Sequence, residues 1–79
     1  MPIYLVHIDD GGPPSEPVTL EARDCLDARR EATAYAGEML RDRPDAFWTS
    51  QPWRITVTDE ATGAQLFAIT VEGRTAYRR

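Results

Sequence analysis

The sequence has no lysine, no asparagine, one cysteine and one histidine. A single cysteine excludes a disulfide within the chain, and it excludes a zinc site built from several cysteines. Long apolar runs are also missing, because the first one, residues 3–6, stops at His7 and has no basic residue before it. We therefore expect neither a signal peptide nor a membrane span. This pattern is typical of a cytoplasmic protein.

The charge balance is acidic, with nine Lys plus Arg residues against thirteen Asp plus Glu and a net charge of −4. Binding to nucleic acid independently of its sequence relies on neutralising phosphates, so this balance argues against nucleic acid as a partner. Seventy-nine residues form one domain with a small core. A chain of this size gains stability when a partner buries more of its surface.

The strongest periodic pattern lies at residues 24–43, where apolar side chains recur at spacings of three and four. This spacing predicts a helix whose apolar stripe consists of Cys25, Ala28, Ala32, Tyr35, Ala36 and Met39, with Leu40 at its margin. Asp24 is expected to cap the helix and Pro44 to stop it. The small side chains, with Gly37 beside them, predict a close approach of this helix to a sheet.

Alternating apolar and polar residues predict four short strands, at residues 3–8, 18–22, 53–58 and 65–71. The glycines and prolines of residues 9–17 predict a loop, and residues 59–64 predict the turn of a hairpin. Residues 44–52 are interpreted as an irregular connection between the helix and the third strand.

The order of these elements predicts an α+β fold, ββαββ: a four-stranded, mostly antiparallel sheet with one helix packed on one face. The β-grasp arrangement of strands has the same element order and stays open as an alternative. We expect residues 1–71 to form the single domain and residues 72–79 to form a polar, arginine-rich C-terminal tail.

Three motifs resemble a family of short proteobacterial proteins that is known as a domain of unknown function. The first is an opening Met-Pro-x-Tyr strand followed by His7, Asp10 and Gly11, and the second is an Ala-Arg-x-Glu-Ala helix at residues 28–32. The third is a Val-Thr-Asp-Glu hairpin that begins at Val57. The resemblance covers about residues 1–71. It implies the fold and a bacterial source, and it offers no activity, cofactor or catalytic residue.

Two residues are candidates for chemistry. His7 is near Asp9, Asp10 and Glu16 in the sequence, which allows a metal site or a general base, but a solvent-facing strand histidine beside Asx turns explains it better. Cys25 is expected at the first helical position, where a thiol becomes more acidic, yet it also falls on the apolar stripe as a small buried residue. We predict no catalytic residue, no cofactor and no metal.

The aromatic and arginine clusters allow structural or binding roles. Trp53 is predicted in the core, and Trp48 is interpreted either as a cap on the helix end or as an exposed interface anchor. Arg74, Arg78 and Arg79 invite an interpretation as a nucleic-acid site, but without interleaved aromatics they are more typical of a solvated terminus.

We predict a non-enzymatic interaction domain that forms a homodimer or binds a protein partner through a sheet face or edge. The expected interface residues are Ile3, Leu5, His7, Trp48, Leu66 and Ala68. Apolar residues among them break the polar pattern expected of a solvated sheet face. The alternative is a nucleic-acid-linked regulator, such as a small antitoxin-like protein with the same order of strands and helix.

Overall fold

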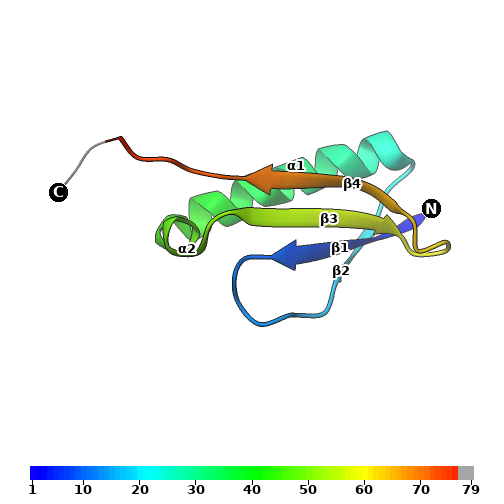
Figure 1. The fold of residues 1–79 in the computed structure, drawn as a ribbon. Coiled ribbons are helices and arrows are strands. Elements are labelled where there is room, and N and C mark those ends of the chain that lie inside the picture. Colours follow the sequence, from blue (N-terminus) through cyan, green and yellow to red (C-terminus); the bar gives the residue numbers. More distant parts are fainter. Residues whose placement is uncertain (77–79) are drawn as a thin grey trace.

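A computed structural model describes residues 1–76 of the chain. Its elements are β1 (Ile3–Asp9), β2 (Val18–Glu21), α1 (Cys25–Asp42), α2 (Pro44–Ser50), β3 (Trp53–Asp59) and β4 (Gln65–Val71). The strands form one sheet and the helices form a second layer behind it (Figure 1). The predicted α+β fold is confirmed, and α1 with α2 takes the place of the single predicted helix. Over residues 1–76, no helix combines the length and the apolar character that crossing a membrane requires.

The strand order is β2-β1-β3-β4, and each neighbouring pair is antiparallel. The N-terminal strand β1 is therefore central, with Val6 opposite Val18 on one side and Val57 on the other. In a β-grasp sheet the first and last strands pair in parallel, whereas in the described chain β1 pairs with β2 and β3. The β-grasp alternative is thus not the arrangement that this chain adopts.

The core lies between the sheet and the small-residue stripe of α1. Large side chains of the sheet, such as Tyr4, Trp53 and Ile55, are at most 5% exposed. The helix contributes Ala28, Ala32, Ala36 and Met39, which are its buried residues. Small side chains facing large ones allow the two layers to approach closely and to reach native packing density. The predicted apolar stripe is confirmed at these four positions.

The start of α1 is held by the predicted cap. The Asp27 N–H donates to Asp24 Oδ1 over 2.8 Å, and the Arg23 N–H donates to Asp27 Oδ2 over 3.1 Å. These two bonds satisfy backbone donors that have no partner within the helix. Cys25 is exposed, so the expectation that it is buried is wrong. As the first helical residue, it has no preceding turn of helix to cover it.

Gly37 does not serve the close packing that its sequence context suggested. A Cβ atom placed on it would meet no atom within 4 Å, because the residue is exposed on the outer side of α1. Its neighbour Ala36 is buried instead. One residue along a helix turns the side chain by about 100°, which is enough to move it from the core to solvent.

The interpretation of residues 44–52 as irregular is wrong for most of their length, because α2 occupies Pro44–Ser50. Pro44 ends the first helix and is also at the first turn of the second, where a missing N–H breaks no hydrogen bond. Phe47 is the buried residue of α2. Proline thus marks a junction between two helices rather than the end of helical structure.

Candidate interaction surface

The sheet face opposite α1 is uncovered by any other element in residues 1–76 (Figure 1). The pairing register places these residues on it: Ile3, Leu5 and His7 from β1, Arg54, Thr56 and Thr58 from β3, and Ala68 and Thr70 from β4. Leu66 is two residues before Ala68, at a bulge in the β3–β4 pairing, and joins them by the alternation of side chains along β4. Those of β4 are all exposed, whereas Ile3 and Leu5 are half-buried by their neighbours. This face is the candidate interaction surface.

The structure places five of the six expected interface residues on this face, but in two separate groups. Ile3, Leu5 and His7 are on β1, while Leu66 and Ala68 are on β4. Strand β3 runs between them, so about 10 Å of polar surface separates the groups. The apolar residues therefore flank a polar middle strip.

The imidazole of His7 hydrogen-bonds to a threonine of the neighbouring strand β3 and not to a carboxylate. Its Nε2 atom lies 3.2 Å from Thr58 Oγ1. The carboxylates of Asp9 and Asp10 instead accept hydrogen bonds from Gly11 and Gly12 in the following turn, over 3.3 and 3.1 Å.

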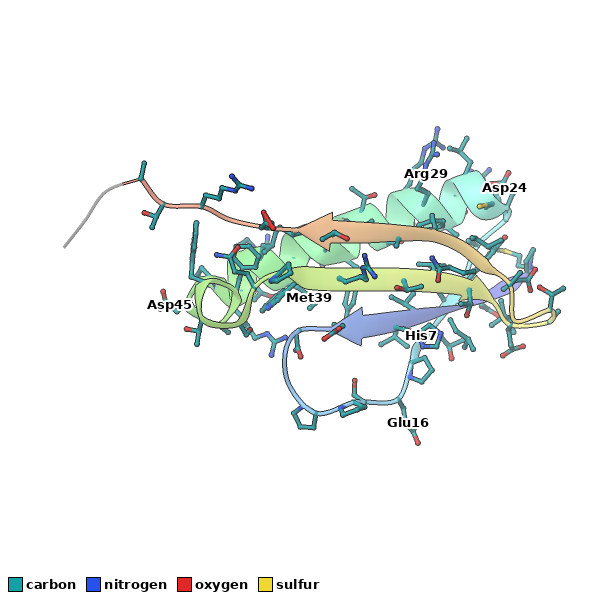
Figure 2. All side chains as sticks on the ribbon, viewed as in Figure 1. His7, Glu16, Asp24, Arg29, Met39 and Asp45 are labelled. Atoms are coloured by element: carbon teal, nitrogen blue, oxygen red, sulfur yellow. The ribbon has the colours of Figure 1, made fainter. Side chains whose placement is uncertain are left out.

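Figure 2 shows Glu16 on the loop, pointing away from the sheet and from His7. Across residues 1–76, no group of three His, Cys, Asp or Glu side chains is arranged to hold a metal ion. The residues that the sequence offered for metal or acid–base chemistry are therefore not brought together.

Trp48, the sixth expected residue, is on α2 and not on the open face. It is 50% exposed, and its ring meets the buried Phe47 edge-on with centroids 5.5 Å apart. The ring also covers the backbone of Gly73, just after β4. Trp53 is buried as predicted, and its Nε1–H donates to Ser50 Oγ over 3.1 Å. Arg78 and Arg79, which the sequence indicates as part of a solvated terminus rather than a nucleic-acid site, are outside the described residues.

The free edge of β4 is a feature that the sequence interpretation did not single out. Within the described chain, β4 pairs with β3 alone and forms one border of the sheet. Its seven residues, QLFAITV, include no charge and no proline, two of the devices that commonly protect an edge, and its pairing with β3 has one bulge, where the register shifts between Val57 and Thr58. The opposite border, β2, is four residues long, follows Pro17 and ends at Glu21. In the sequence, only the absence of charged residues from residues 65–71 indicates that this border differs from the β2 border.

Hydrogen bonds at the hairpin turn show which way the β4 backbone faces. The Asp59 N–H donates to the Ala64 carbonyl over 2.9 Å, so Asp59 faces β4, whereas the Glu60 N–H donates to the Ile3 carbonyl on the other side. Because these directions alternate along a strand, Val57 and Ile55 also face β4 and bond to their partners Phe67 and Ile69. The N–H and C=O groups of Ala68 and Thr70 therefore point outward, away from β3.

Tyr4 has a shifted pKa, but it is on the buried side of the sheet. Burial raises the pKa of its phenol, and Coulombic interactions with Cys25, Asp59 and Asp24 raise it further. The shift favours the neutral hydroxyl and belongs to the core rather than to the open face.

Comparison with known proteins gives a family match. The model of a family described as Domain of unknown function (DUF6894) matches residues 3–72. Neither the curated proteins nor the solved structures provide a significant match.

Proposed function

The chain belongs to the DUF6894 family, a domain of unknown function, and we propose that it is a small, non-enzymatic bacterial interaction domain. In this proposal it acts in the cytoplasm and binds itself or a protein partner through its sheet. The observation that carries the proposal is the free β4 edge, which has no charge or proline and is bordered by the exposed side chains of Leu66 and Ala68. Unpaired strand edges of this kind recruit another strand by main-chain hydrogen bonding.

Several features support a protein partner over nucleic acid. The net charge is −4, and within the described residues Arg54 is the one arginine on the open face, where the other basic residue is His7. Binding to phosphates needs several such cations, whereas strand pairing needs backbone groups and apolar neighbours. The antitoxin-like alternative therefore rests on the order of the elements alone.

The test of this function compares two matched alanine-to-glutamate variants. Ala68→Glu places a charge on the β4 edge, whereas Ala34→Glu places the same charge on the exposed side of α1. Light scattering at micromolar concentration detects self-association, and immobilised protein reports retention of another chain. We expect association with wild type and with Ala34→Glu, and its loss with Ala68→Glu.

A third variant examines the open face itself. Leu5→Glu adds a charge to the β1 group of apolar residues, which is two strands away from the β4 edge. Loss of binding in this variant as well would extend the contact across the face. Wild-type protein that retains nucleic acid and no protein would contradict the proposal and favour the regulator alternative.

A further inference from the structure

We infer that the partner is a second copy of this chain, with β4 of one copy paired antiparallel to β4 of the other about a two-fold axis at Ala68. The two four-stranded sheets then become one eight-stranded sheet, with both α1 helices on the same side. This inference rests on the proposed function and names its partner. Three independent features of the described residues lead to it.

The first feature is that β4 is self-complementary about its centre. Ala68 is the middle residue of Gln65–Val71, and its N–H and C=O both point outward, so two copies can exchange a pair of hydrogen bonds there. In this register Phe67 is opposite Ile69 of the second copy, on the helix side. Aromatic and β-branched residues are favourable cross-strand partners. The residue on the axis is alanine, so no large side chain obstructs the close approach.

The second feature is the position of α1 over the sheet. Its closest strands are β3 and β4, and it runs in the same direction as β4 (Figure 1). Neighbouring strands are about 4.8 Å apart, so pairing β4 with β4 brings the two α1 axes to about 10 Å from each other. Packed helices lie 8–10 Å apart, which means that the strand pairing and the helix contact are compatible.

The third feature is the flank of α1 that faces the free edge. Glu31 and Glu38 border the hollow beside β2, so the opposite flank of the helix is directed toward β4 and beyond. That flank carries Leu26, which is 46% exposed, and a shallow hollow that is lined by Leu26, Arg29, Arg30 and Thr33. Leu40 is seven residues after Thr33, as Leu26 is seven before it. An antiparallel pair of α1 helices centred on Thr33 therefore places Leu26 against Leu40 of the second copy.

The other edge of the sheet explains why the assembly stops at two. The border strand β2 is short, with Glu21 at its end and Pro17 before it, so it is a poor template for a further strand. A contact between identical surfaces about a two-fold axis is closed, because each copy uses its β4 edge once.

Cross-linking tests the register directly. In a Cys25→Ser background, which removes the exposed native thiol, Ala68→Cys places one thiol at the axis. Residues opposite each other in a hydrogen-bonded pair have Cα atoms about 5.5 Å apart, within disulfide range. We expect a disulfide-linked dimer on mild oxidation. Thr56→Cys in the same background is the control, because it is on the same face but one strand further from the axis, and it should stay monomeric.

The helix contact has its own test. A Leu26→Cys chain mixed with a Leu40→Cys chain, both carrying Cys25→Ser, should form a mixed disulfide in preference to either homodimer. Preference for either homodimer would overturn the antiparallel helix pairing.

Solution mass separates failure of this inference from failure of the proposed function. We expect wild-type protein to have twice the chain mass of 8.9 kDa and Ala68→Glu to have that mass once, with unchanged circular dichroism. A wild-type dimer that Leu5→Glu dissociates but Ala68→Glu does not would overturn the edge pairing and leave the proposed function standing. A wild-type monomer that retains another protein through β4 would overturn the inference that the partner is a second copy, and it would leave the proposed function standing. A monomer that retains no protein would overturn both.

Discussion

Trp48 shows how one residue can look like an interface anchor and still have a structural role. Its ring is half exposed, but its inner edge covers the backbone where the chain leaves β4. The N–H of Gly73 donates to the side-chain carbonyl of Gln51, which fixes that backbone against α2. A side chain at position 73 would occupy the space that the ring already fills. The glycine and the tryptophan are therefore a matched pair.

We predict that Gly73→Ala lowers the free energy of unfolding by about 1–3 kcal/mol, the usual cost of overpacking. The new Cβ atom would lie 2.6 Å from Trp48 Cη2 and 3.1 Å from Phe47 Cε2. Urea denaturation measures the effect. In a Trp48→Ala background the same change should cost much less, because the ring is gone. Equal costs in the two backgrounds would contradict the matched pair.

Tyr4 makes a second residue-scale prediction, about alkaline pH. Its folded-state pKa is raised, chiefly by burial, above that of the unfolded chain. Below the unfolded pKa of about 10 the two states carry the same proton, and this contribution to stability is complete. As the pH rises further, the unfolded tyrosine loses its proton first, so stability falls until the folded pKa is passed.

The measurement compares wild type with Tyr4→Phe by urea denaturation from about pH 8 to about pH 11. Wild type should lose stability more steeply with pH, because the variant has no phenol at this position. Parallel pH profiles would show that burial of Tyr4 does not affect its titration.

At the scale of elements, local pattern predicted what each segment is but not which segments are neighbours. Apolar residues recur at every second position in Trp53, Ile55 and Val57, which predicts a strand, and the alanines of α1 recur at every fourth position, which predicts a helix. These elements are therefore predictable from local sequence. The pairing of β1 with β3 cannot be predicted from local sequence patterns, because the two strands are far apart in the sequence. The helix α2 was missed because proline breaks a helix in its interior yet is suited to its first turn.

Two glycines allow a comparison of backbone conformation alone. Gly37 is inside α1, and Gly63 has a φ of 74° in the β3–β4 turn, yet an added Cβ would meet no atom within 4 Å at either site. Gly37→Ala should raise stability by up to about 1 kcal/mol, since alanine favours helix. Gly63→Ala should lower it by about 1–2 kcal/mol, because a left-handed residue with a Cβ is strained. Urea midpoints that shift in the same direction would contradict this prediction.

The small stripe of α1 makes the second element-scale prediction. Ala32 is 1% exposed between α1 and the sheet, so Ala32→Leu should overpack the contact and cost about 1–3 kcal/mol. Ala34→Leu is the control, because Ala34 is exposed, and it should change stability by no more than about 0.5 kcal/mol. An unchanged urea midpoint for Ala32→Leu would mean that the sheet yields to the larger side chain.

For the whole molecule, the sheet has two unlike faces and two unlike edges, and the sequence revealed the faces more readily than the edges. Alternation places Leu5 and Ala68 opposite the helix side, which the pairing register confirms. It could not show that β3 separates them, because strand order is a property of the assembled sheet. The sequence predicts a mixed apolar and polar patch on this face, and the assembled sheet adds the β4 border as a second candidate surface.

Association by that border makes stability depend on concentration. If β4 joins two copies, the melting temperature of wild type should rise with protein concentration, because mass action favours the folded dimer. Ala68→Glu should melt at a lower temperature that does not change with concentration. Calorimetry across about a hundredfold range of concentration tests this. A wild-type melting temperature that stays constant over that range would argue against a dimer.

The central place of β1 also has a consequence for synthesis on the ribosome. Of the four strands of this domain, β1 is synthesised first and has two neighbours. Strand β2 follows it after a short loop, but β3 ends at Asp59, about 50 residues after β1. At roughly 5–20 residues per second, β1 waits about 3–10 seconds for its second neighbour. During that interval Val6 and Ile8 of the nascent chain lack Val57 and Ile55, the residues of β3 that lie opposite them in the finished sheet. Folding of this domain is therefore completed only after the β3–β4 hairpin has emerged.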